Sequence, residues 1–424
     1  MGTLIKSVKV IDPQSSFNGK TVDIFIEDGE IQAIGKNLDK KGATLLEGEA
    51  WCVSPGWFDL QVNLCDPGFE LREDIQSGVK AAAAGGFTAI GAYPNTQPPI
   101  HSKTEVEYII NKAKSLKRNA VDVYPVGTVS HHQQGNDLAE LYDMSRSGAI
   151  AFTDGKRTAS DAGLLLRALL YVRNFNGIVI AHCNDKSIAA GGKMNEGATS
   201  TLLGLKGIPA LAEEVMVARN IRIAEYAEAR IHLASISTAG SVELVRVAKR
   251  KGIAVTASVN SLNLVFTDEA LMGFDTNFKL DPPLRTKKDV LALIEGVKDG
   301  TIDCITSDHT PVDVENKVVE FDNAESGNSS IETTYASVTT NWGEIITPEI
   351  WVQQVAINSR ELVNLPVPQI KEGTKANLTL FEPNKQWALE AKALKSKSHN
   401  TPFIGVNFKG RVVGIFNKNT YIPA

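Results

Sequence analysis

Cysteine is scarce in this chain, with four residues among 424. So few thiols argue against a disulfide scaffold and suit a reducing compartment. No apolar run reaches the roughly 18 residues that a membrane-spanning helix needs, and the first residues lack the continuous apolar segment of a secretion signal. Positive charge is not in excess either, because 44 Lys and Arg face 49 Asp and Glu, a net charge of −5. We therefore expect a cytoplasmic, soluble protein without a nucleic-acid or membrane partner.

Apolar residues, in contrast, are abundant. They make up 43% of the chain, against 22% charged residues. This composition excludes a disordered or fibrous protein. The length suits two or three domains, although barrels often run longer as one unit.

Both ends of the chain have the sequence pattern of short antiparallel strands. A DG pair at 28–29 separates apolar segments at 24–26 and 31–34, which is a strong hairpin signal because glycine accepts the positive φ of a tight turn. Similar segments recur at 377–381 and 411–416. Neither end has enough strands to bury a sheet face alone. We predict that residues 1–54 and 366–424 join into one small β-sandwich domain.

Short apolar runs alternate with helical patterns between the two ends. The eight runs are Trp57 to Leu60, Phe87 to Ala92, Val121 to Val126, Ala149 to Phe152, Ile178 to Ala181, Ile231 to Ala234, Ile253 to Val259 and Ile302 to Thr306. Several are apolar on both faces, as parallel strands covered by helices should be. The pattern predicts an α/β fold, a (β/α)8 TIM barrel over residues 55–365. An open doubly wound sheet is the alternative, but no GxGxxG follows the early strands.

Three helix starts are readable in the predicted barrel. Thr286 opens a capping-box-like stretch that continues to Asp289, and Pro209 can open a helix. Ser160 or Asp161 can cap another helix.

Function in such a barrel belongs to the carboxyl ends of the strands. The residues at or just past these ends carry amides, carboxylates and imidazoles. They are Gln61, Asn63 and Cys65 after the first strand, Asn95 after the second, Asp154 and Gly155 after the fourth, His182 at the fifth, Ser235 at the sixth, Asn260 at the seventh, and Asp308 and His309 at the eighth.

These residues lie within a series of motifs that extends over nearly the whole chain. The motifs are SPGWFDL at 54–60, AAAAGGF at 81–87, PNT at 94–96, AHC at 181–183, MNEG at 194–197, DTNFK at 275–279, PPLR at 282–285, DGTID at 299–303 and SDH at 307–309. In this order they resemble the dihydroorotases of the amidohydrolase superfamily. The resemblance implies an amidohydrolase-type barrel and reversible hydrolysis of the cyclic amide of dihydroorotate. It also implies zinc, which lowers the pKa of a bound water and polarises the amide carbonyl.

The metal-ligand positions that the resemblance implies are largely substituted. The family's His-x-His after the first strand is Gln61-Val-Asn63, and amides are poor zinc donors. Its bridging Asp falls on Gly155 and its sixth-strand His on Ser235, while His182 and Asp308 are kept. Two of six positions therefore survive, and a one-residue shift could recruit Asp154.

The substrate side departs from the family as well. The Arg that would grip the substrate carboxylate is Cys65, whose thiol cannot replace a bidentate guanidinium. If a ligand binds, Asn95, Asn277 and His309 are the candidate contacts, and the Asn that usually precedes the double proline is Asp281.

We interpret the chain as a noncatalytic dihydroorotase homologue with Asp308 as a vestigial general base and zinc absent or weakly bound. The resemblance implies aspartate carbamoyltransferase as a partner and a homodimer as the family's habit. One alternative is an active cyclic-amide hydrolase with a single-metal site at His182 and Asp308, completed by Asp154 or Cys183. Another is a sensor of a small polar molecule. Cys65 can be read as a nucleophile, but a free cysteine is more often an apolar packing residue.

Overall fold

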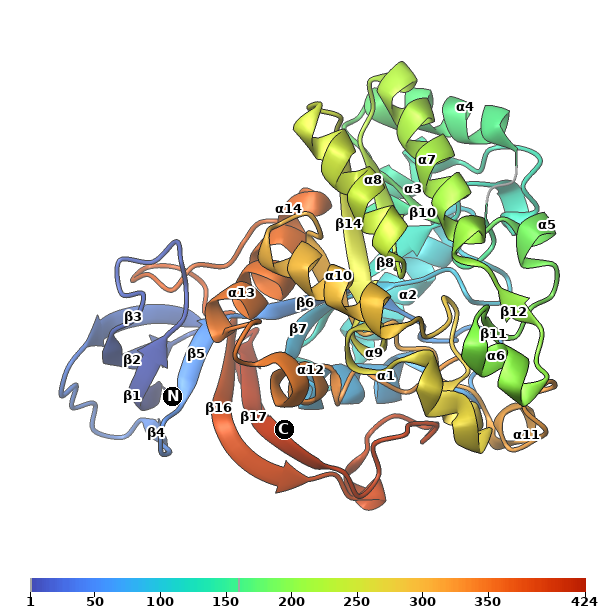
Figure 1. Ribbon diagram of the computed structural model, residues 1–424. Helices are drawn as coiled ribbons and strands as arrows, with labels where there is room; N and C mark the ends of the chain where they lie inside the picture. Colours follow the sequence, from blue (N-terminus) through green and yellow to red (C-terminus); the bar gives the residue numbers. More distant parts are fainter. Residues whose placement is uncertain (1, 159–160) are drawn as a thin grey trace.

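A computed structural model describes residues 2–158 and 161–424. Eight parallel strands form a nearly closed barrel, in the chain order β6 to β10 and then β13 to β15 (Figure 1). They are β6 (Trp57–Val62), β7 (Phe87–Ala92), β8 (Asp122–Gly127), β9 (Ala151–Phe152), β10 (Val179–His182), β13 (Ile231–Ala234), β14 (Val255–Asn260) and β15 (Cys304–Thr306). A bridge between Val62 and His309 brings the last strand back to the first. The predicted (β/α)8 barrel is confirmed, and each predicted strand overlaps an observed one.

Helices follow the barrel strands and cover them. They are α1 (Ile75–Ala84), α2 (Lys103–Ser115), α3 (Leu141–Ser147), α4 (Ala162–Arg173), α5 (Lys186–Ala189), α6 (Ala198–Leu203), α7 (Ala210–Ala227), α8 (Ala239–Arg250), α9 (Ser261–Val265), α10 (Lys287–Lys298), α11 (Val314–Lys317), α12 (Thr334–Trp342), α13 (Pro348–Val352) and α14 (Ser359–Leu362). Two short strands, β11 (Met194–Asn195) and β12 (Gly207–Ile208), pair with each other outside the barrel.

The predicted helix starts agree with the observed caps. Thr286 and Asp289 form a capping box at α10, and Pro209 directly precedes α7. Asp161 caps α4 by accepting from the backbone N–H groups of residues 163 and 164. Ser160, the other predicted cap, lies outside the described residues.

The two ends of the chain meet in a second sheet of eight strands. Five come from the N-terminal side, namely β1 (Thr3–Val10), β2 (Thr21–Glu27), β3 (Glu30–Gly35), β4 (Thr44–Leu46) and β5 (Cys52–Pro55). Three come from the C-terminal side, namely β16 (Leu378–Ala388), β17 (Asn407–Asn417) and β18 (Thr420–Pro423). The antiparallel pair β5–β16 joins the two groups. The division of the chain into residues 1–54 plus 366–424 and residues 55–365 stays a prediction.

The hairpin predicted at residues 28–29 joins β2 to β3. Asp28 and Gly29 both have positive φ, at 51° and 79°. Two positive φ values in a two-residue loop match the right-handed twist of the paired strands, which is why the DG pair is favoured there.

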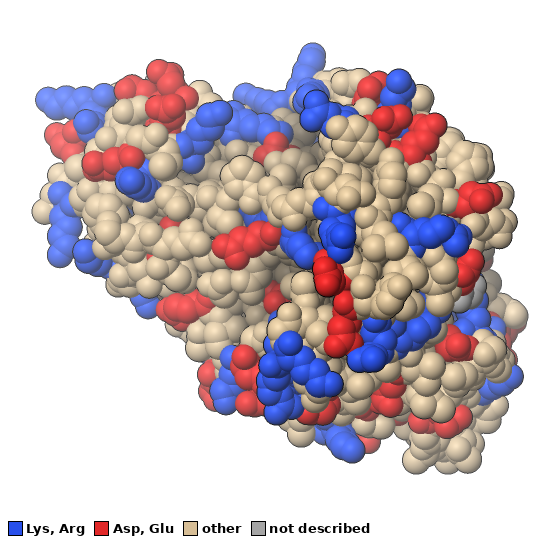
Figure 2. Space-filling model, turned by 90° about the horizontal axis from the view of Figure 1, so that it is seen from above, with Lys and Arg blue, Asp and Glu red and all other residues tan. Residues whose placement is uncertain are grey.

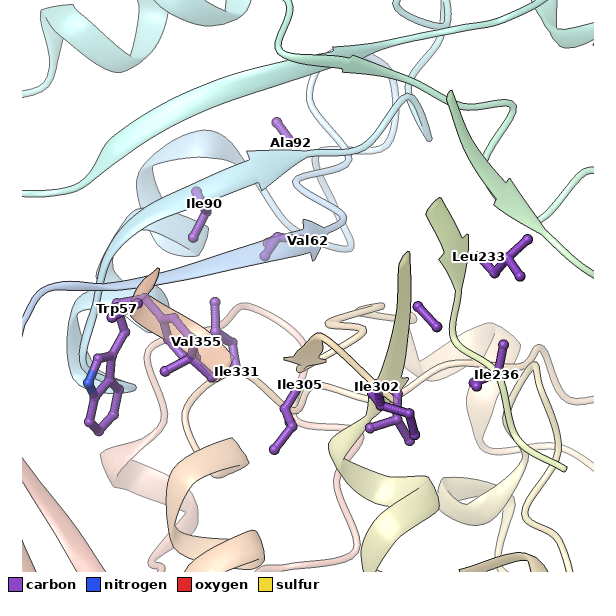
Figure 3. Close-up of a cluster of buried hydrophobic side chains, with 14 of the residues drawn as sticks. Trp57, Val62, Ile90, Ala92, Leu233, Ile236, Ile302, Ile305, Ile331 and Val355 are labelled. Carbon is purple, nitrogen blue, oxygen red and sulfur yellow. The ribbon is translucent and has the colours of Figure 1, made fainter. Parts of the chain in front are cut away.

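Apolar side chains fill the space between the barrel strands and their helices (Figure 3). Trp57, at the start of β6, is fully buried at the centre of an aromatic cluster. Its ring centroid lies 5.0–6.0 Å from those of Phe87, Tyr335, Trp351 and Phe381. Because Phe381 belongs to β16, this cluster packs the terminal sheet against the barrel. This packing holds the barrel strands in place, so the residues at their carboxyl ends can form a functional site.

Charged side chains of both signs are interspersed over the face shown in Figure 2. Among the helices of residues 2–158 and 161–424, none has the length and hydropathy needed to span a membrane.

Candidate functional site

Asp308 stands at the centre of the barrel mouth, two residues past the end of β15, and is 8% exposed. Its Oδ1 accepts a hydrogen bond from Gln61 Nε2 at 2.6 Å. Its Oδ2 accepts from Lys156 Nζ at 2.6 Å and from Asn260 Nδ2 at 3.0 Å. Burial raises the pKa of the Asp308 carboxyl, and Lys156 opposes this shift. Three donors from three different strand ends therefore occupy both oxygens of this carboxylate.

Lys156 links Asp308 to the other surviving position, His182. Its ammonium also donates to the backbone carbonyl of Asp281. The Asp281 carboxylate in turn lies 3.4 Å from His182 Nε2. Burial opposes ionisation of Asp281, but His182 and Lys156 outweigh it and hold the pKa of this carboxyl at about 2. Lys156 was not among the residues predicted from the sequence, because it lies in the loop after β9 and not at a strand end.

The substituted positions are hydrogen-bonded within the same network. Asn63 Nδ2 donates to the carbonyl oxygen of His309 at 3.0 Å and to Thr310 Oγ1 at 2.8 Å. Ser235 Oγ donates to Gln61 Oε1 at 3.0 Å. The Gln61 amide therefore accepts at one atom and donates at the other, which fixes its orientation between Ser235 and Asp308.

The residues considered as replacement metal ligands have other partners. Asp154 accepts from the backbone N–H groups of Val129 and Ser130, both at 2.9 Å, and from Ser130 Oγ at 2.7 Å. Cys183 Sγ accepts from Asn220 Nδ2 at 3.4 Å. Gly155 offers no side chain at all. These contacts hold Asp154 and Cys183 to their own neighbours rather than to His182.

Cys65 is buried, at 1% exposure, and its Sγ accepts from Asn95 Nδ2 at 3.3 Å. Burial raises the pKa of the Cys65 thiol to about 12, and the Asn95 hydrogen bond opposes this only in part. Because the thiolate is the nucleophilic form, Cys65 lacks the lowered pKa that a catalytic cysteine needs. The structure thus favours the interpretation of Cys65 as a packing residue.

Two of the three suggested ligand contacts lie away from the open cavity at the barrel mouth. His309 is fully buried, its Nε2 lies 3.3 Å from Glu73 Oε2, and its Nδ1 accepts from the Ser330 N–H at 3.2 Å. Asn277 receives a hydrogen bond from Asn328 at its backbone oxygen. Neither is among the residues that line the cavity described next. Glu73 was not selected from the sequence, because it lies in a loop far from any strand end.

The open cavity has a volume of about 720 Å³. Asn95, the third suggested contact, lines it together with Tyr93 and Lys156. Within the described part of the chain, the buried atoms Tyr93 Oη and Asn95 Oδ1 have no hydrogen-bond partner. Buried polar atoms are usually satisfied, so these two are free to bind a water or a ligand in the cavity.

Three residues of this region have left-handed backbone angles that L side chains rarely adopt. The φ values of Cys65, Ser235 and Asp308 are 59°, 56° and 52°. Each such residue costs of order 1 kcal/mol, and such residues cluster at active sites.

Comparison with known proteins identifies the family of this chain. A model of the family described as dihydro-orotase-like matches residues 51–241. The dihydroorotase of Pelotomaculum thermopropionicum is 43% identical over 97% of this chain and 96% of its own length. That of Syntrophus aciditrophicus is 40% identical over 97% of each chain. The chain belongs to the dihydroorotase family.

Solved hydantoinase structures resemble this dihydroorotase-family protein over nearly its whole length. The L-hydantoinase of Arthrobacter aurescens has a TM-score of 0.86 at 22% identity, covering 99% of this chain and 96% of its own. A D-hydantoinase from a Thermus species has a TM-score of 0.80 at 20% identity, covering 99% and 94%. At these identities the match supports the amidohydrolase-type fold alone.

Zinc is the metal that membership of the dihydroorotase family implies, and the residues present do not fit it as arranged. A catalytic zinc ion usually has three protein ligands drawn from imidazole, thiolate and carboxylate. Within residues 2–158 and 161–424, no three His, Cys, Asp or Glu side chains lie together in an arrangement that could hold a metal ion. The groups that face Asp308 are an ammonium and two amide N–H groups, which donate hydrogen bonds and offer no lone pair to a cation.

Proposed function

We propose that this dihydroorotase-family protein belongs to pyrimidine biosynthesis but does not hydrolyse dihydroorotate. The observation that carries the proposal is that Gln61 donates to one oxygen of Asp308, while Lys156 and Asn260 donate to the other. A general base needs a free oxygen that can accept a proton from the reacting group. Here both oxygens are engaged by N–H donors.

The proposed role of the chain is then a structural one, as a partner of aspartate carbamoyltransferase. Two considerations support it. The substitutions gather at the barrel mouth, whereas the strand cores and helix caps are intact. In addition, the motifs resemble the noncatalytic dihydroorotase homologues that hold this carbamoyltransferase in an active assembly. A fold that keeps its core without its metal ligands suits a scaffold.

The test of lost catalysis is turnover of dihydroorotate by the purified protein after zinc loading. An Asp308→Asn variant serves as the control for contaminating host enzyme, and the Syntrophus aciditrophicus relative serves as the reference assay. We expect no turnover of dihydroorotate by either wild type or Asp308→Asn. Turnover by wild type that Asp308→Asn abolishes would show instead an active hydrolase with an unusual metal site, and the proposal would be wrong.

The partner is tested separately, with purified aspartate carbamoyltransferase from the same source. We expect a stable complex in size-exclusion chromatography coupled to light scattering, and higher carbamoyltransferase activity in the complex. The mass of the chain alone, measured in the same run, tests the expected homodimer. Absence of a complex together with unchanged carbamoyltransferase activity would remove this partner and leave the first proposal standing.

A second candidate function, binding of a small polar molecule, is favoured by the unpartnered Tyr93 Oη and Asn95 Oδ1 in the cavity. A ligand that binds only the folded state raises the melting temperature. We expect dihydroorotate or carbamoyl aspartate to raise Tm for wild type and not for Asn95→Ala. Equal Tm values with and without ligand would exclude both molecules.

A further inference from the structure

Lys156 brings a positive charge to the middle of the barrel mouth. It lies in the loop after β9, and its side chain is 27% exposed. The ammonium donates to Asp308 Oδ2 at 2.6 Å and to the backbone carbonyl of Asp281. It therefore stands between the acidic residue that follows β15 and the Asp281–His182 pair.

A buried carboxylate needs a compensating charge, because transfer of an isolated ion out of water is very unfavourable. The Asp308 side chain is 9% exposed, and Lys156 is its ion-pair partner. The remaining donors to Asp308, Gln61 and Asn260, are neutral amides. Among the other neighbours, Asp281 raises the pKa of the Asp308 carboxyl and His182 lowers it.

We infer that the Lys156 ammonium is a resident cation that takes the place of a bound metal ion at the barrel mouth. The substitutions then form one coherent set. Where imidazoles would supply lone pairs to a metal, Gln61 supplies an N–H group to Asp308, as Lys156 and Asn260 do. The carboxylate that would bind a cation from solution instead binds one from its own chain.

This inference rests on the proposed loss of catalysis, and it makes a stronger statement. Restored ligands should bind zinc more weakly while Lys156 is present, because the ammonium and the metal compete for Asp308. A zinc ion bound by imidazoles and this carboxylate would be repelled by an ammonium held beside them.

The test uses the double variant Gln61→His/Asn63→His, which with Asp308 offers three protein ligands. Zinc affinity is measured by competition with a chromogenic chelator, in the Lys156 background and with Lys156→Met added. We expect at least tenfold tighter zinc binding when Lys156→Met is present. Equal affinity in the two backgrounds, or no binding in either, would overturn the inference.

A stability cycle provides a readout that does not depend on metal. Lys156→Met leaves Asp308 without its cation, and Asp308→Asn leaves Lys156 without its anion, so each should lower Tm, by about 3 °C or more. The double variant Lys156→Met/Asp308→Asn has neither charge and should recover most of the loss. Losses that simply add would contradict the inference. Lys392→Met, whose pair with Glu390 is largely exposed, is the matched control and should leave Tm unchanged.

The two proposals fail in different ways. Turnover of dihydroorotate by wild type would remove the proposed loss of catalysis. Suppose instead that wild type does not turn over dihydroorotate, and that Gln61→His/Asn63→His binds zinc equally well with and without Lys156. Only the inference about Lys156 would then be wrong.

Discussion

Gln61 Nε2 donates to Asp308 Oδ1 at 2.6 Å across 247 positions of the chain. This contact ties the first barrel strand to the last. Replacement by Gln61→Leu leaves the buried Oδ1 without a donor, and we expect the free energy of unfolding to fall by about 1–3 kcal/mol. Gln61→Glu should be worse, because it places a second carboxylate beside the first.

Urea denaturation followed by circular dichroism measures both changes. Gln134→Leu, at an exposed position of the same face, is the control and should stay within about 0.5 kcal/mol of wild type. A wild-type midpoint for Gln61→Leu would show that the amide does not stabilise Asp308.

The buried pair Glu73–His309 anchors the segment before α1 to the segment after β15. Their side chains are 0% and 1% exposed, and Glu73 also accepts from Ser77 and Ser396. We expect Glu73→Ala to lower the free energy of unfolding by about 3–5 kcal/mol, as removal of one member of a buried pair does. The exposed Glu361→Ala is the control in the same denaturation series, and similar midpoints for both variants would contradict this role.

His232 should make the protein acid-sensitive. It is fully buried between Thr256 Oγ1 and Ser258 Oγ, each 3.0 Å away, and burial lowers its pKa to about 3. Between pH 6.5 and 3 the unfolded chain therefore binds a proton that the folded chain does not. Stability is then lost as the pH falls through this window, with a slope of up to about 1.4 kcal/mol per pH unit.

The variant His232→Asn lacks the group that binds this proton. We expect its stability to depend less on pH, and its maximum stability to be lower than that of wild type. Thermal denaturation from pH 7 to pH 4 measures the slope. The exposed His399→Asn should keep the wild-type slope. An unchanged slope in His232→Asn would assign the acid sensitivity to other groups.

The thiols should resist modification in the folded protein. All four cysteines are buried. Burial raises the pKa of Cys52 to about 11 and those of Cys65 and Cys183 to about 12, and it raises that of Cys304 as well. We expect almost no reaction with Ellman's reagent at pH 8, and four thiols per chain in guanidinium chloride. If one thiol reacted rapidly in the native state and this reaction were lost in Cys65→Ser, Cys65 would be a reactive thiol and not a packing residue.

The fold could be predicted from the sequence because its signals are local. Runs such as Phe87 to Ala92 are apolar on both faces and match a barrel strand at both bounds. The DG pair at 28–29 and the capping box at Thr286 act within a few residues. Periodicity and turn chemistry therefore sufficed for the elements and for their alternation.

The site could be predicted only in part, because its contacts join distant positions. Strand ends indicated Gln61, Asn260 and Asp308, which the structure brings together. The direction of the Lys156 side chain depends on the path of the loop after β9, and no local pattern encodes it. His309 shows the converse, since its strand-end position suggested a ligand contact, whereas its ring faces Glu73.

The pairing of β5 with β16 has a consequence for synthesis of the chain. Strand β5 pairs with β1 on one side, but its other partner is β16, so β5 leaves the ribosome more than 300 positions before that second partner exists. During this interval the edge of β5 that β16 covers is open to other chains. A nascent polypeptide stalled before residue 378 would expose that edge permanently, so premature termination should yield aggregates rather than a shortened soluble barrel.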